Sequence, residues 1–340
     1  MAEPVLVLGV VLLLAVTFDF INGFHDTANA IATVVATRVL APRQAILMAA
    51  SLNFLGALSG TAVASTVGKG IIDPSAATQA VIIAALGSAI LWNLVTWYFG
   101  IPSSSSHALI GGLVGAALAF KGSGVLNRSG LETIVVTLIA SPVVGLIFGF
   151  LLMIGLLWLV FRESPHSVNA HFRRFQLLSS AFMSFSHGSN DAQKTMGIIT
   201  MSLFSYGLIS DFQVPTWVMV MAATAMAVGT SVGGWRIIKT MGHKIIKLEP
   251  IHGFAAETAA ATVIQLASHF GLPVSTTHVI SGSIMGVGAS RRLSAVRWGV
   301  AGDMLMAWVM TIPATATVAW LLFEGFNVVR GALALVGVGA

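Results

Sequence analysis

Charged side chains are scarce in this sequence, and cysteine is absent. Asp, Glu, Lys and Arg make up only 9% of the 340 residues, whereas a soluble globular chain carries about 25%. This scarcity excludes a water-soluble enzyme, a nucleic-acid-binding protein and a disordered chain. The absence of cysteine excludes a disulfide framework and a metal site built from thiolates.

Apolar residues make up 56% of the chain and form long stretches without a charged side chain. These stretches are residues 44–68, 74–120, 133–161, 212–235, 258–290 and 304–323. A helix needs about 20 apolar residues to cross the hydrocarbon core of a bilayer, so each stretch can hold at least one span. Residues 1–16 are also apolar, and they lack a basic start and a small-residue cleavage site. We therefore expect a retained span there and not a signal peptide. The sequence predicts an all-α polytopic membrane protein.

The basic residues gather in four loops. These loops are residues 38–43, 162–174, 236–247 and 291–297. Short loops rich in Lys and Arg stay in the cytoplasm, so we expect these four there and the near-neutral or acidic loops outside. The longest polar stretch, residues 162–175, is the expected cytoplasmic linker between two halves, residues 1–161 and residues 176–340.

Two motifs of the first half recur in the second half, in the same order. The segment FINGFHDTAN at residues 20–29 recurs as FSHGSNDAQK at residues 185–194, which aligns Asp26 with Asp191. The segment GIPSSSSH at residues 100–107 recurs as GLPVSTTH at residues 271–278. Two matches in one order indicate an internal repeat.

The expected sidedness makes the two halves cross the membrane in opposite senses. Residues 75–120 begin and end outside, whereas residues 251–290 begin and end inside, so each segment makes two crossings or a re-entrant hairpin. One helix broken at each Asp motif completes the topology and leaves both chain termini outside the cytoplasm. Two inverted-topology repeats with broken helices and re-entrant hairpins are the architecture of secondary transporters, whose sites lie near the midplane.

Carboxylate and amide side chains interrupt the apolar sequence in the first motif. An acid at membrane depth costs roughly 2.5 kcal/mol or more, so Asp26 and Asp191 are candidates for ion coupling, or else they cap half-helices. Their amide neighbours are Asn22, Asn29 and Asn190. These amides offer oxygen ligands to a small cation, or else interhelical hydrogen bonds. Lys194 stands where the first copy has Asn, so its ammonium would either replace a bound cation or pair with Asp191.

Other titratable side chains lie within the apolar stretches. Glu257 must find a partner or solvent there, so it joins the ion-coupling candidates. His25 and His187 lie in the Asp motifs and are candidates for a proton relay. For His107 and His278, relay and simple packing are equal alternatives.

The second motif places Pro and hydroxyl side chains ahead of an apolar helical segment in both halves. Pro ends the incoming helix, and Ser or Thr caps the outgoing one. The free N–H groups and the dipole at the helix start form an anion site without arginine. Two such sites facing each other would surround a tetrahedral oxyanion, whereas ordinary capped hairpin tips are the alternative. The candidate substrate-binding residues are Ser103, Ser104, Ser105, Ser106, Ser275, Thr276 and Thr277.

The paired motifs resemble the PiT family of inorganic phosphate transporters, in particular its bacterial low-affinity permeases. The resemblance rests on the motifs GFHDTANA, FLG, GIPSSSSH, SHGSNDAQK and GLPVSTTH, and it extends over essentially the whole chain. It implies a duplicated, inverted fold, commonly a homodimer in the cell membrane, that moves phosphate into the cytoplasm with sodium or protons. The transport-site residues that it implies are Asp26, Asn29, Asn190, Asp191, Ser105, Ser106, Thr276 and Thr277.

Two positions depart from the sodium-coupled members of that family. Asn53 stands where many of them have an acid, and Lys194 stands where they have Asn. Both departures resemble bacterial members described as proton-coupled carriers of neutral metal–phosphate, although Glu257 matches the common pattern. We therefore expect import of phosphate, alone or as metal–phosphate, by alternating access coupled to protons. Sodium coupling and sulfate transport are the alternatives.

The duplication of both motifs argues against an enzyme, because it gives each half the same residues and no asymmetric pair of nucleophile and base. An intramembrane hydrolase using the Asp pair or a Ser–His pair is the alternative from another class, and an ion channel is a further one. We expect no cofactor and assign no metal site. The residues that would hold sodium, if it binds, are Asp26, Asn29, Asn190 and Asp191. The expected partners are phosphate, a co-transported H⁺ or Na⁺, the lipid bilayer and a second copy of the chain, but no nucleic acid.

Overall fold

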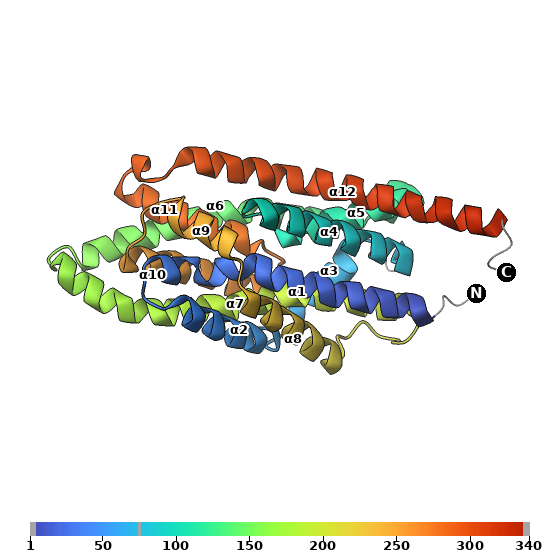
Figure 1. Cartoon of the computed structure of the whole chain (residues 1–340), viewed down its shortest axis with the longest axis horizontal. Helices are drawn as coiled ribbons and strands as arrows, with labels where there is room; N and C mark the ends of the chain where they lie inside the picture. Colours follow the sequence, from blue (N-terminus) through green and yellow to red (C-terminus); the bar gives the residue numbers. More distant parts are fainter. Residues whose placement is uncertain (1–4, 74–75, 336–340) are drawn as a thin grey trace.

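The structure is a computed structural model that describes residues 5–73 and 76–335. Within these ranges the regular secondary structure is helical apart from one isolated β-bridge, between Ile72 and Leu126. The α-helices are α1 (Val5–Ala36), α2 (Pro42–Ala57), α3 (Ala62–Gly70), α4 (Gln79–Phe99), α5 (Ser105–Lys121), α6 (Arg128–Leu159), α7 (Pro165–Tyr206), α8 (Thr216–Val232), α9 (Trp235–His243), α10 (Pro250–His269), α11 (Thr276–Arg291) and α12 (Trp298–Leu335). Two 3₁₀ turns, η2 (Gly122–Val125) and η3 (Leu293–Ala295), follow α5 and α11. Most helices run along the long axis of the molecule (Figure 1).

Several helices have the length and composition of membrane spans. Among the described residues these are α1, α4, α6, α12 and the continuous segment of α5 and η2. Two bent pairs, α2 with α3 and α8 with α9, raise the number of candidate spans to as many as seven. The two pairs bend by 70° and 72°. The predicted all-α polytopic membrane architecture is confirmed.

Two helical hairpins, α4–α5 and α10–α11, have their tips inside the molecule. Each turn begins with a glycine in the left-handed region, Gly100 at φ 68° and Gly271 at φ 69°, where a side chain would be strained. Ser104 and Ser275 then accept hydrogen bonds from backbone N–H groups three residues on, which caps α5 and α11. The prolines and hydroxyl residues of both tips are buried. The predicted hairpins are therefore present.

The breaks expected at the Asp motifs are wrong, because α1 and α7 run unbroken through them. The motif glycines serve close packing instead. A Cβ on Gly23 would lie 2.4 Å from the Met226 carbonyl oxygen of α8, and one on Gly188 would lie 2.2 Å from the Asn53 carbonyl oxygen of α2. The broken helices of this fold are the bent pairs, whose gaps are residues 58–61 and 233–234.

Each half of the chain packs mainly against the other half. α1 lies against α8 and α9, and α7 lies against α2 and α3. Similarly, α5 packs on α12 and α6 packs on α11. Each of these contacts thus has a counterpart, in which the equivalent helix of the second half packs against the equivalent helix of the first half. The arrangement brings the middle of α1, the middle of α7 and both hairpin tips together.

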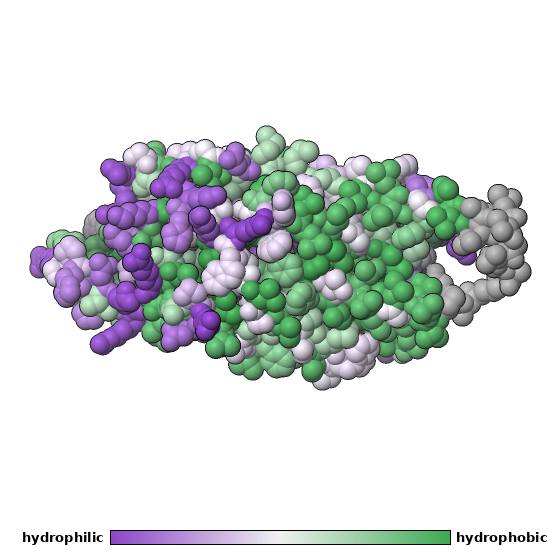
Figure 2. Space-filling view, viewed as in Figure 1, coloured by the Kyte–Doolittle hydropathy of each residue, from purple (hydrophilic) through white to green (hydrophobic). Residues whose placement is uncertain are grey.

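Hydrophilic side chains gather at one end of the elongated molecule, and apolar ones cover most of the remaining surface of the face shown in Figure 2. We call this the basic end. It comprises residues 38–43, 162–174, 236–247 and 291–297. The start of α1 and the end of α12 lie at the other end (Figure 1). The basic residues that the sequence assigned to one side of the membrane are therefore also grouped in space.

Candidate functional site

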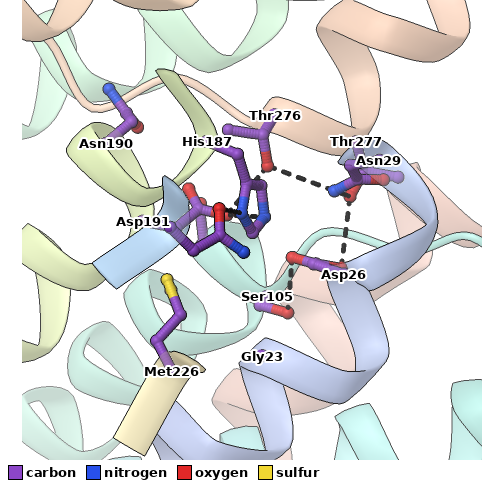
Figure 3. A network of polar contacts seen from close by, with 12 residues as sticks. Gly23, Asp26, Asn29, Ser105, His187, Asn190, Asp191, Met226, Thr276 and Thr277 are labelled. Carbon is purple, nitrogen blue, oxygen red and sulfur yellow. Dashed lines mark hydrogen bonds and ion pairs between the residues drawn. The ribbon is translucent and has the colours of Figure 1, made fainter. Parts of the chain in front are cut away.

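Asp26 of α1 is buried beside the tips of both hairpins (Figure 3). Its carboxylate lies 2.6 Å from the Nδ1 atom of the adjacent His25. The Ser105 hydroxyl donates to it at 3.2 Å and the Thr277 hydroxyl at 3.4 Å. One carboxylate therefore contacts hydroxyl groups from the first and the second hairpin.

Asp191 of α7 has a corresponding environment. The Thr276 hydroxyl donates to its carboxylate at 2.8 Å. The Nε2 atom of His187, one helical turn earlier, lies 3.2 Å from the same carboxylate oxygen. The second oxygen pairs with the ammonium of Lys194. The two aspartates, aligned from sequence alone, thus both contact the second hairpin tip, and Asp26 also contacts the first.

Lys194 is buried, and its three N–H donors are all used. Besides Asp191, its ammonium donates to the Ser106 hydroxyl at 2.6 Å and to the Val274 carbonyl at 2.9 Å. The pairing with Asp191, one of the two alternatives for this lysine, is therefore present. The ammonium thereby links α7 to the tips of both hairpins.

The amide side chains differ in their orientation. Asn29 donates to the hydroxyls of Thr276 and Thr277 at 3.2 and 2.9 Å. Asn190 instead points away from the aspartates (Figure 3) and donates to the Ser268 hydroxyl at 2.9 Å. The buried side-chain oxygens of Asn22, Asn29 and Asn190 have no hydrogen-bond partner among the described residues. Such oxygens can accept a proton donor or coordinate a cation.

A cluster that can hold a metal ion lies within this site. One ligand atom each from Asp26, His187 and Asp191 lies within 4.8 Å of the others, and all three residues are buried. The sequence assigned no metal site, and His187 was expected only as a relay. Its spacing of four residues from Asp191, which places both on one helical face, is a signal in the sequence that could have indicated a shared role.

Comparison with known proteins identifies the family. A model described as the Phosphate transporter family matches residues 22–169 and again residues 162–319. This chain belongs to the phosphate transporter family. A probable low-affinity inorganic phosphate transporter of Rhizobium meliloti is 52% identical over 93% of this chain and 95% of its own length. The Bacillus subtilis protein of the same description is 50% identical, over 94% of this chain and 97% of its own.

A solved structure titled "The sodium-dependent phosphate transporter" has the same fold as this transporter. It superposes with a TM-score of 0.86 at 27% identity and covers 95% of this chain and 99% of its own. The relatives are named as transporters, in agreement with the expectation that this chain is a carrier and not an enzyme. The two stretches matched by the family model each contain one of the two motif aspartates, Asp26 or Asp191, and one hydroxyl motif.

The hydroxyl residues of the two tips divide into three groups in this transporter. Ser105, Ser106, Thr276 and Thr277 face the aspartates, Lys194 or Asn29. Ser104 and Ser275 are N-caps, as the alternative of ordinary capped hairpin tips predicted. Ser103 donates to Thr96 of α4 at 2.9 Å and contacts no aspartate.

Glu257 lies apart from the aspartates, between α10, α1 and α7. Its carboxylate accepts hydrogen bonds from the hydroxyls of Thr33 and Ser179 and, at 3.3 Å, from the Gln176 amide. The expectation that this acid finds partners is confirmed, and all of its partners are uncharged. Asn53 is closer to the site, since its amide oxygen lies 3.1 Å from the His187 Nδ1 atom.

Proposed function

We propose that this transporter imports inorganic phosphate by symport with protons, through alternating access at the site between the two hairpin tips. The observation that carries the proposal is the meeting of Asp26, Asp191 and four hydroxyl side chains at one buried position. Helix starts and hydroxyl groups are suited to an oxyanion, because they present N–H and O–H donors without requiring arginine. The donor residues are Ser105, Ser106, Thr276 and Thr277.

Charge balance supports co-transport with a cation. With both aspartates ionised, Lys194 protonated and the adjacent His25 and His187 neutral, the buried site has a net charge of −1. A phosphate dianion entering that site is repelled, and both partners are poorly solvated there. One proton or cation taken up at Asp26, which has no lysine partner, removes the excess charge. Uptake of the anion therefore requires the cation, and this requirement is the physical basis of coupling.

Proton coupling is supported by the position of Lys194 and by the two histidines. The ammonium already neutralises Asp191, which reduces the need for a second bound cation. His25 and His187 contact the two carboxylates and can exchange protons with them. The sodium-coupled alternative is favoured by the unpaired amide oxygens of Asn22 and Asn29. The metal-ligating cluster supports cargo in the form of metal–phosphate.

We further propose that the basic end faces the cytoplasm and that the halves, residues 1–161 and 176–340, are inverted repeats joined by residues 162–175. The exchange of roles between the halves in the helix contacts supports the repeat. The gathering of basic residues at one end supports the orientation, with both termini outside the cytoplasm. A homodimer in the cell membrane completes the proposal and rests on the family resemblance.

Uptake of labelled phosphate into proteoliposomes tests the proposed function. One arm imposes an inward proton gradient without sodium, a second imposes a sodium gradient at equal pH, and a third adds competing sulfate or a divalent cation. We expect accumulation in the first arm, no gain from sodium and little competition by sulfate. Accumulation that requires sodium would overturn proton coupling, and equal competition by sulfate would overturn phosphate selectivity.

A further inference from the structure

A cavity of about 570 Å³ opens at the basic end, away from the aspartates. It is formed where the α9–α10 connection, the start of α10, the end of α11 and η3 meet. The titratable side chains that line it are Lys247, Glu249, His252, Arg291, Arg292 and Arg297. Arg291 is fifteen residues beyond the tip residue Thr276 on the same helix, or about 22 Å along its axis. The cavity is thus separate from the site between the hairpin tips.

The cavity carries a concentrated positive charge. Four of its lining side chains are cations and one is an acid. None of the four cations forms an ion pair with any residue that the structure describes. Arg297 is held in place, because its guanidinium donates to the His243 carbonyl at 3.1 Å and its N–H donates to the Ile245 carbonyl at 3.0 Å.

The remaining polar groups leave this charge available. Glu249 donates its backbone N–H to the Nδ1 atom of His252 at 3.1 Å, which fixes the imidazole at the wall of the cavity. The guanidinium of Arg291 lies 3.5 Å from the other ring nitrogen. Two of the cations, Arg291 and Arg292, are adjacent and exposed. Guanidinium groups bind phosphate oxygens through paired, charge-assisted hydrogen bonds.

We infer that this cavity binds a phosphate-bearing anion of several negative charges, as a site distinct from the transported substrate's. A polyphosphate or nucleotide from the cytoplasm has this chemistry, and so does the headgroup of an anionic phospholipid. His252 belongs to α10 and Arg291 to α11, so a bound anion joins the two arms of one hairpin. The tip of that hairpin carries Thr276 and Thr277, which face the aspartates.

Calorimetric titration of the purified protein in phosphatidylcholine nanodiscs tests the site. The probe is inorganic tripolyphosphate, whose several negative charges match the four cations of the cavity. We expect saturable binding that weakens as salt is raised. The double variant Arg291→Gln/Arg292→Gln should bind about tenfold more weakly or worse. The matched control is Arg43→Gln/Arg174→Gln, which removes two exposed arginines of the basic end outside the cavity.

A second arm distinguishes the two sources of the ligand. Nanodiscs containing phosphatidylglycerol are compared with pure phosphatidylcholine, and retained phosphatidylglycerol is measured after lipid exchange. The cavity is assigned to a lipid headgroup if phosphatidylglycerol competes with tripolyphosphate. The same assignment follows if tripolyphosphate does not bind but the retention of phosphatidylglycerol depends on Arg291 and Arg292. Tripolyphosphate binding that phosphatidylglycerol does not affect assigns it to a soluble anion. The inference is overturned if neither ligand binds, if the double variant binds as wild type does, or if the control loses as much.

Discussion

At the residue scale, the negative charge of Asp26 is the feature that the coupling mechanism needs. Asp26→Asn keeps the volume and one hydrogen-bond acceptor but removes that charge, so we expect gradient-driven phosphate uptake to fall to the protein-free background. Asp191→Asn should have the same effect, although it also leaves the Lys194 ammonium without its partner. The control is Asp303→Asn, at an exposed acid of α12. Wild-type uptake by either central variant would contradict the coupling role.

The buried ammonium of Lys194 gives a second prediction at this scale. Lys194→Asn leaves the Asp191 carboxylate buried without its cation, and breaking such a pair typically costs about 3–5 kcal/mol. We expect a lower thermal stability in detergent and partial recovery when sodium is added, because a free cation can then occupy the vacated position. Lys239→Gln, at an exposed lysine of α9, is the control and should leave stability unchanged. Stability that does not respond to sodium would show that the ammonium does not stand in for a bound cation.

At the scale of the helices, glycine contacts set how closely the two halves pack. Gly188→Ala introduces a Cβ 2.2 Å from the Asn53 carbonyl oxygen, so α2 and α7 must separate. Overpacking of this kind costs about 1–3 kcal/mol, and the displaced α2 also carries the partner of His187. We expect a lower melting temperature together with reduced uptake. Gly299→Ala, which meets nothing within 4 Å, should preserve both. An unchanged melting temperature for Gly188→Ala would contradict the close packing.

Some features of these helices could be predicted from the sequence, and others could not. The hairpin turns were predictable, because Pro ends the incoming helix and Ser or Thr caps the outgoing one. The breaks in α1 and α7 were predicted wrongly, because a glycine within a helix is compatible both with a break and with close packing. The rotation of each helix about its own axis, which decides where its side chains point, could not be predicted from the sequence either. The motifs indicated that Asp26 and Asp191 share one site, but a single sequence does not reveal that Asn190 points away or which of the hydroxyl residues is the cap.

At the scale of the whole molecule, we expect the distribution of basic residues to set the orientation in the membrane. The chain has no cysteine, so a single introduced cysteine reports the side on which its position lies. Ala41 is exposed at the basic end, and Ser123 is exposed in η2, which follows the α4–α5 hairpin. With a membrane-impermeant maleimide, we expect Ser123→Cys to be labelled in intact cells and Ala41→Cys only after permeabilisation.

The wild-type chain is the control for this labelling, since it should take up no reagent. The reverse pattern would place the basic end outside the cell, and labelling of both variants in intact cells would contradict a molecule that spans the bilayer between them. The orientation also decides which solution reaches the arginine-lined cavity. With the basic end inside, tripolyphosphate should act on transport only from the cytoplasmic side, because the bilayer separates that cavity from the side on which phosphate enters.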